Sequence, residues 1–245
     1  MQLLMDNVAL VRNLEKSQLS VFTTQQLAIM MQMNVASATV KLNRLVKKGV
    51  LIRIIQGRYI LPSADILSIA SSIYPPSYIS LLAAYEYYGT TTQTPRIIDV
   101  INTQRSTTLS LSLETGKFNI RFIKVDRSLM YGYNKIIING KATMIAEKEK
   151  SIIDGLIFSR YVPLDEVFSC IQSISDHTKT IQYAILSKRQ TIMKRLGYLL
   201  SVQNIKCSPK NFPHLSKTYV PLDPRHPRQG KYEKTWRIII NKVIE

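Results

Sequence analysis

The sequence contains few cysteines, few histidines and few acidic residues. Its 245 residues include two cysteines, Cys170 and Cys207, three histidines and 16 Asp+Glu. Two cysteines make neither a disulfide framework nor a cysteine-rich metal site, so we expect a reducing, cytoplasmic compartment. His177, His214 and His226 are widely spaced and have no metal-type partner nearby, and His214 and His226 should be exposed in loops. We therefore expect no metal site.

A signal peptide and a membrane span are not indicated. The first residues, from Met1 to Asp6, lack a basic region and a long apolar region. The uncharged stretch from Ile66 to Tyr85 is about as long as a bilayer span. It contains five serines and has Pro75-Pro76 at its centre. We interpret it as a linker followed by a buried helix, and we expect no membrane partner.

Positive charge is abundant and unevenly distributed. The formal net charge is +17, and 45% of the residues are hydrophobic, which excludes a disordered polymer. Residues 1–62 carry eight Lys/Arg against two acids, residues 63–178 carry eleven of each sign, and residues 179–237 carry thirteen Lys/Arg against two acids. Two basic blocks around a neutral middle indicate two surfaces that meet a polyanion, although a solvated basic face is the plainer interpretation.

The first basic block predicts three helices. Apolar residues recur at helical spacing up to Leu14 and predict a first helix ending near Lys16, with the positions Leu3, Leu4, Val8, Leu10, Val11 and Leu14. Thr23 and Gln26 have the spacing of a capping box, so a second helix should start at Thr24. A third helix is expected from Ala36 to Lys48, with Gly49 as its stop and with Ala38, Leu42, Leu45 and Val46 on its inner face.

A β-hairpin follows these helices. Two β-rich runs, residues 50–55 and 58–61, are joined by Gln56-Gly57. Three helices and a basic hairpin are typical of a winged helix-turn-helix, whose third helix fits the major groove of duplex DNA. We expect Arg44 and Lys41 to read bases, and the remaining predicted DNA-binding residues are Ser37, Thr39, Asn43, Lys47, Lys48, Arg53, Gln56 and Arg58.

The rest of the chain changes from strands to helices near Ala146. A helix is expected from Ile79 to Tyr88, five β-rich runs lie between Ile97 and Ile145, and four helical segments and a terminal strand follow. This order predicts an α+β fold. We expect a DNA-binding domain over residues 1–62, a linker over residues 63–76 and an α+β domain over residues 77–245.

The chain resembles the AbiEi antitoxins of abortive-infection, type IV toxin–antitoxin systems. The resemblance rests on the winged module through Gln56-Gly57-Arg58-Tyr59 and on later segments, namely residues 80–89, 93–95, 98–101, 146–154, 194–200, 222–224 and 236–241. It implies a transcriptional repressor of its own operon that binds inverted repeats and counters a nucleotidyltransferase-like toxin, as a monomer or weak dimer. The long basic loop from Lys206 to Lys234 departs from the family pattern and leaves the action of the second domain in doubt.

The second basic block has two interpretations. Leu196, Gly197 and Leu200 can pack inward from an amphipathic surface helix. Alternatively, this block forms a second surface for DNA or RNA, made of Lys188, Arg189, Lys194, Arg195, Arg225, Arg228 and Lys231.

No catalytic or cofactor site is predicted. The nine glycines are scattered, so no phosphate-cradling loop is present. The acids of Glu147-Lys-Glu-Lys150 more simply occupy the first turn of a helix, and Asp154 is expected to pack or cap. We therefore expect no enzyme and no cofactor. Two alternatives stay open: a stand-alone winged-helix transcription factor, and an interaction protein whose basic C-terminal block binds a toxin or RNA.

Overall fold

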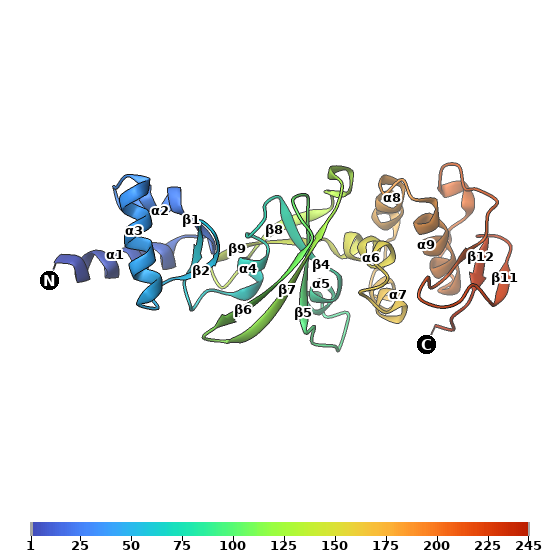
Figure 1. Ribbon diagram of the computed structural model, residues 1–245. Coiled ribbons are helices and arrows are strands. Elements are labelled where there is room, and N and C mark those ends of the chain that lie inside the picture. The colour runs from blue at the N-terminus through green and yellow to red at the C-terminus, as the bar shows by residue number, and fades with distance from the viewer. Residues whose placement is uncertain (1, 245) are drawn as a thin grey trace. The chain divides into compact units, whose positions relative to one another are not determined.

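The computed structural model describes residues 2–244, and their side chains from residue 7 onward (Figure 1). Leu3 and Leu4, which the sequence placed on the first helix, therefore lie outside the described side chains. The fold mixes helices with three sheets, which confirms the α+β class. No helix in this part of the chain is both long and apolar enough to cross a bilayer.

The described residues form two compact units. One unit contains the chain up to Ile79, together with Arg96–Lys124 and Lys135–Ile145. The other contains Ser80–Pro95, Val125–Asn134 and Ala146–Glu245. These boundaries differ from the expected 1–62 and 77–245 domains, because the strands of one sheet come from distant parts of the chain. The expected linker, residues 63–76, contains a short helix, and its Ile69, Ala70 and Ile73 are buried.

The winged module forms the start of the first unit. Its elements are α1 (Gln2–Lys16), β1 (Phe22–Thr23), α2 (Thr24–Met30), α3 (Val35–Lys47), β2 (Ile52–Ile55) and β3 (Arg58–Ile60). The strands form a small sheet in the order β1-β3-β2, and Phe22 pairs with Tyr59. Leu14, Leu27 and Leu42 are fully buried at its core. The three helices and the hairpin were predicted, but β1, which has only two residues, was not.

Local sequence signals set the ends of these helices. The Thr23 side chain accepts a hydrogen bond from the Gln26 backbone, and Gln26 accepts one from the Thr23 backbone at 2.8 Å, which confirms the capping box. Asn34 caps α3 by accepting from the Ser37 backbone at 2.8 Å, a cap that the sequence analysis missed. Gly49 follows α3 with a φ of +73°, a conformation that glycine adopts without strain.

A six-stranded sheet occupies most of the remaining first unit. Its order is β6-β7-β5-β4-β9-β8, from β4 (Ser77–Ser80), β5 (Ile97–Asn102), β6 (Thr107–Leu113), β7 (Gly116–Lys124), β8 (Tyr133–Ile138) and β9 (Lys141–Ala146). β5 runs parallel to β7, and β6 and β7 form an antiparallel hairpin. The short helix α4 (Ile66–Ala70) contacts β5.

One predicted helix is corrected. The segment expected to be helical from Ile79 begins as strand β4, and helix α5 covers only Leu81–Tyr87. Leu81 has a φ of +58°, which turns the chain sharply between the strand and the helix. Ile79 pairs with Ile145 of β9, so tertiary pairing overrides the local helical pattern.

The second unit is mainly helical. Its further helices are α6 (Lys148–Ile157), α7 (Leu164–Gln172), α8 (Thr178–Leu186) and α9 (Gln190–Val202). A three-stranded sheet follows in the order β10-β12-β11, from β10 (Val220–Pro221), β11 (Lys231–Glu233) and β12 (Ile238–Ile240). The second unit also contains two short 3-10 helices, η1 (Arg127–Leu129) and η2 (Pro209–Asn211).

Candidate nucleic-acid interface

The outward face of α3 is not centred on Lys41 and Arg44, the two residues expected to read bases. Ala38, Leu42 and Leu45 are buried, so the opposite side of the helix faces away from the core. Residues at i, i+4, i+7 and i+11 share a face, and the exposed line opposite the core is Ala36, Val40, Asn43 and Lys47.

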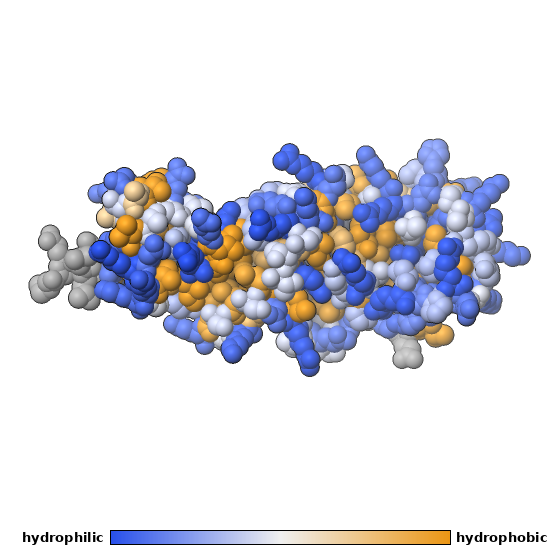
Figure 2. Space-filling model, viewed as in Figure 1, coloured by the Kyte–Doolittle hydropathy of each residue, from blue (hydrophilic) through white to orange (hydrophobic). Residues whose placement is uncertain are grey.

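Val40 lies at the middle of this face and was not among the predicted site residues. Its side chain is 53% exposed. Figure 2 shows hydrophobic residues among hydrophilic ones on the visible face of this module. An apolar side chain on such a helix can contact the methyl group of thymine. Val40 lies opposite Ala38, Leu42 and Leu45, which the sequence already placed on the inner face, so its exposure could have been predicted from the sequence.

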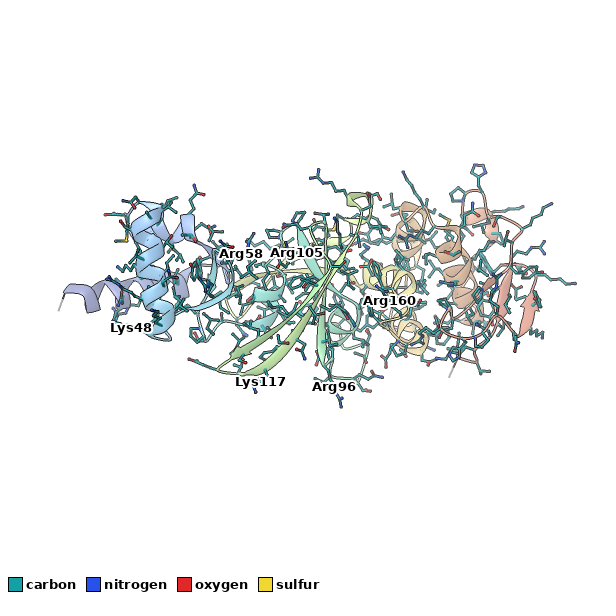
Figure 3. The ribbon with its side chains drawn as sticks, viewed as in Figure 1. Lys48, Arg58, Arg96, Arg105, Lys117 and Arg160 are labelled. Atoms are coloured by element: carbon teal, nitrogen blue, oxygen red, sulfur yellow. The ribbon has the colours of Figure 1, made fainter. Side chains whose placement is uncertain are left out.

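Lys41 is less exposed than Arg44 and Lys47. Its side chain is half-buried and lines a cavity of about 250 Å³ together with Asn13 and Met33. Arg44 and Lys48 are exposed, and Figure 3 labels Lys48, which directly follows the last residue of α3. Ser37 and Thr39 are also exposed, but the Thr39 hydroxyl donates to the Val35 carbonyl at 2.7 Å within the helix.

The hairpin presents its polar residues beside the start of α2. Arg53 and Gln56 are exposed, and Arg58 is half-buried on β3. The Thr24 backbone donates to the Gly57 carbonyl at 3.0 Å, which ties the tip of the wing to the first residue of α2. The wing is therefore a short, anchored hairpin, and the Arg58 label in Figure 3 marks its second strand.

The cations of the winged module are free to bind anions. Among the described residues, none of the ion pairs within 4 Å involves a side chain before Asp99. Arg44, Lys47 and Lys48 on α3 therefore have no carboxylate partner in the described part of the chain. Free cations on a recognition helix are what phosphate and guanine contacts require.

Two residues of the predicted second basic surface, Lys194 and Arg195, are buried. Lys194 is 1% exposed, and its ammonium donates to the Thr218 carbonyl at 2.7 Å and to the Ser216 hydroxyl at 3.0 Å. Arg195 is 8% exposed and donates to the Pro221 carbonyl at 3.0 Å. Burial lowers the pKa of both groups. They hold the C-terminal loop against α9, so they do not belong to an exposed surface.

The other predicted members of that surface are exposed. Lys188 and Arg189 lie before α9, and Arg228 and Lys231 lie beside β11. Arg225 pairs with Asp223 at 2.8 Å, so part of its charge is already neutralised. Leu196, Gly197 and Leu200 pack inward as expected, yet most of α9 is buried, so it is not a surface helix.

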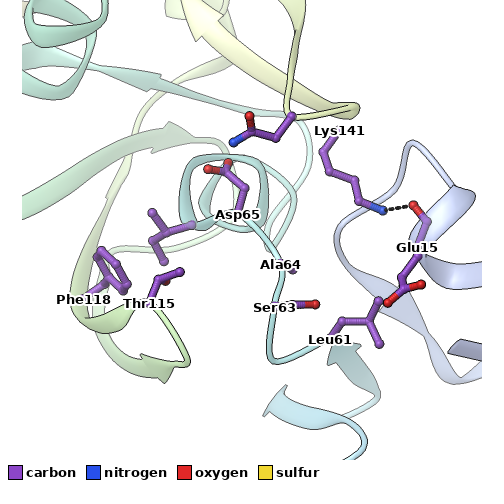
Figure 4. Close-up of a pocket in the computed structure, with 10 residues that line it drawn as sticks. Glu15, Leu61, Ser63, Ala64, Asp65, Thr115, Phe118 and Lys141 are labelled. Atoms are coloured by element: carbon purple, nitrogen blue, oxygen red, sulfur yellow. Dashed lines mark hydrogen bonds between the residues drawn. The ribbon is translucent and has the colours of Figure 1, made fainter. Parts of the chain in front are cut away.

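A cavity lies at the end of α1. It has a volume of about 360 Å³, and Glu15, Ser63, Asp65 and Lys141 are among its lining residues (Figure 4). Lys141 donates to the carbonyls of Leu14 at 3.0 Å, Glu15 at 2.9 Å and Ser17 at 2.7 Å. Because the Lys141 ammonium already binds these carbonyls, it caps α1 and is not available to a ligand. The described residues also contain no group of three His, Cys, Asp or Glu side chains that could hold a metal.

Comparison with solved structures shows a shared fold. The RV2827C protein from Mycobacterium tuberculosis has a crystal structure that matches with a TM-score of 0.59 at 12% identity, over 94% of this chain and 89% of that one. No curated protein matches the chain. At this identity the likeness concerns the fold alone.

A family model matches the winged module. Residues 10–62 match the model described as "Transcriptional regulator, AbiEi antitoxin". The match spans α2, α3 and the whole hairpin, including every residue proposed on the DNA-binding face. The match agrees with the AbiEi resemblance stated from the sequence over residues 10–62, and the later segments of that resemblance lie outside it.

Proposed function

We propose that the protein binds operator DNA through its winged module and represses its own toxin–antitoxin operon. The observation that carries this proposal is the outward face of α3, where Asn43, Arg44 and Lys47 surround the exposed Val40 without carboxylate partners in the described chain. With α3 in the major groove, these side chains reach base edges, and Ser37, Lys48, Arg53, Gln56 and Arg58 contact phosphates. This assignment moves the second base-reading role from Lys41 to Lys47.

The functional counterpart is a nucleotidyltransferase-like toxin, as the family resemblance implies. The match to an antitoxin regulator supports a toxin–antitoxin role at the family level. A nucleotidyltransferase gene next to this gene would support the antitoxin, and its absence would favour a stand-alone transcription factor. Stable co-purification with that neighbour would favour direct toxin binding. The protein meets inverted repeats as a weak dimer or as two monomers about one helical turn apart.

The test is gel-shift binding to the upstream region of the protein's own gene, with a scrambled duplex as competitor. Arg44→Ala and Lys47→Ala should each weaken binding to the upstream region by about 1–3 kcal/mol, roughly 5- to 150-fold, because each removes a groove contact. Lys41→Ala is the matched control and should have a smaller effect, since Lys41 is half-buried. Equal binding to both duplexes, or a larger loss for Lys41→Ala than for the other two variants, would contradict the proposal.

A further inference from the structure

The small C-terminal sheet has one face built from aromatic and basic side chains. Tyr232 on β11 and Pro221 on β10 both pair with Ile239 on β12, so their side chains lie in one row on one face of the sheet. Tyr219 precedes β10 and Arg237 precedes β12, so each continues this row by one step of two residues. Figure 1 labels β11 and β12 in the red, C-terminal part of the chain.

The aromatic rings of this face contact each other. The rings of Tyr219 and Tyr232 meet edge to face at a centroid distance of 4.9 Å. Arg237 lies over the Tyr219 ring at 5.5 Å and donates to its hydroxyl at 3.1 Å, and Arg228 donates to the Tyr219 carbonyl at 2.8 Å. Tyr232 is nevertheless 58% exposed, so most of this aromatic side chain is open to solvent.

The charge around this face is positive because Lys and Arg outnumber the acids thirteen to two in residues 179–237. In residues 179–237 the acids are Asp223, which is buried and pairs with Arg225, and Glu233, which accepts the backbone N–H groups of Thr235 and Trp236 at 2.8 and 2.7 Å. Lys231 and Lys234 are exposed and have no carboxylate within 4 Å among the described residues. An exposed aromatic ring among free cations suits a polyanion that also presents flat rings.

The backbone of Arg237 has an unfavourable conformation. Arg237 has a φ of +56°, in the left-handed region that favours glycine. A bulky residue at such a φ costs on the order of 1–3 kcal/mol and persists only where its surroundings hold it there. Arg237 has this conformation while its guanidinium lies over the Tyr219 ring.

We propose that the face formed by Tyr219, Arg228, Tyr232 and Arg237 binds single-stranded nucleic acid. A base stacks on the exposed ring of Tyr232, while Arg228 binds an adjacent phosphate. Duplex DNA is a poorer ligand for this face, because paired bases hide their flat surfaces in the stack. The site shares no residue with the winged module, so it operates independently of operator binding.

The experiment measures fluorescence anisotropy of the full chain with labelled oligo-dT, oligo-rU and a mixed-sequence duplex, each about 12 nucleotides long, within the range of roughly 4–16 that such sites cover. Tyr232→Ala should weaken binding to single strands by about 5- to 150-fold, since stacking contributes about 1–3 kcal/mol per base. Tyr232→Phe should retain binding. Different affinities for oligo-dT and oligo-rU decide whether DNA or RNA is the ligand.

Two further variants keep the proposal falsifiable. Arg237→Gly removes the guanidinium and supplies the residue that tolerates the positive φ, so single-strand binding should weaken while the unfolding midpoint does not fall. The double variant Arg44→Ala/Lys47→Ala should lose operator binding and keep single-strand binding. Unchanged affinity in Tyr232→Ala, or loss of single-strand binding in the winged variant, would overturn the proposal and leave the proposed repressor function intact. Equal affinity for duplex and single strands in all variants would also overturn it.

Discussion

A fully buried ion pair illustrates how single residues control the stability of the second unit. Lys150 and Asp154 pair one turn apart on α6 with both side chains buried, the Ser80 hydroxyl donates to Asp154 at 2.8 Å, and Lys150 lies 4.6 Å from the centre of the Tyr131 ring. Burying two charges costs free energy of desolvation, and the attraction between the two charges offsets this cost. Removing one partner leaves the other charge buried without that compensation. The sequence pattern Glu147-Lys-Glu-Lys150 did not reveal this ion pair, because the burial of Lys150 and Asp154 depends on distant residues.

Asp154→Ala should lower the free energy of unfolding by about 3–5 kcal/mol, because it leaves the Lys150 charge buried without its carboxylate. Urea titration measures the change. Lys179→Ala is the matched control, since Lys179 pairs with Glu147 at 2.7 Å but is largely exposed, and it should cost no more than about 1 kcal/mol. Similar losses in the two variants would show that burial does not govern the strength of these pairs.

His177 predicts a pH dependence. The side chain is 5% exposed, and burial lowers its pKa below 6.5, although the charges of Asp176 and Glu149 act in the opposite direction. The unfolded chain therefore binds a proton more readily than the folded chain. Stability is fully present above about pH 6.5 and is lost as the pH falls toward the lowered pKa, by at most about 1.4 kcal/mol per pH unit.

Urea unfolding at about pH 7.5 and 5.5 checks this dependence, in the range where His titrates and most carboxylates do not. His177→Gln should reduce the loss of stability on acidification, because glutamine does not titrate. His214→Gln, at an exposed loop position, should leave it unchanged. An equal acid response in all three proteins would assign it to other groups.

At the scale of elements, one lysine of the large sheet holds the first helix. Lys141 on β9 donates to three carbonyls at the end of α1, and burial lowers the pKa of its ammonium while Glu15 acts in the opposite direction. Lys141→Met should cost about 1–2 kcal/mol and speed hydrogen exchange in the last turn of α1, because these carbonyls lose a charged donor.

Lys135→Met is the control for this prediction. The Lys135 ammonium donates to the side-chain oxygen of Gln18 at 3.3 Å, at the surface near the end of α1. The expected change is within about 0.5 kcal/mol. Unaltered exchange in Lys141→Met would mean that packing alone holds the helix end.

The contact between α9 and the loop before β12 depends on a glycine. A Cβ atom at Gly197 would lie 2.2–2.4 Å from the ring of Trp236, which is buried. In an open helix Gly→Ala stabilises by up to about 1 kcal/mol, but here it should destabilise by about 1–3 kcal/mol through overpacking. Thermal or urea unfolding measures the sign. In a Trp236→Leu background the added cost should shrink, and a purely additive result would exclude the ring as the cause.

At the scale of the whole molecule, the two basic blocks predict strong salt dependence. Operator affinity should fall roughly a thousandfold between about 50 and 200 mM salt if about six phosphates are neutralised, because the log–log slope is near −0.9 per phosphate for duplex DNA. Gel shifts at several salt concentrations measure the slope. Arg53→Ala removes one of the proposed phosphate contacts, so it should make the slope shallower by about one phosphate. A slope near zero would contradict the role of the basic residues.

Much of the fold was predictable because helix and strand signals are local. The capping box at Thr23, the stop at Gly49, the Gln56-Gly57 turn and the β6–β7 hairpin all depend on residues a few positions apart. Strand β1 and the start of β4 were missed, because each is short and forms only by pairing with residues far along the chain. The DNA-binding role of α3 stays a prediction, and which of its residues are exposed depends on the side that the core covers.

The sequence alone therefore determined the α+β class, the winged module, its basic character and its family resemblance, since these follow from local periodicity, caps and charge. Tertiary structure alone decided which cations reach solvent. Lys194 and Arg195 have the same charge as Lys47 and Arg44, yet they are buried against carbonyls of Thr218 and Pro221, more than twenty residues away. Burial is a property of the packed chain, because it depends on neighbours that no local pattern identifies.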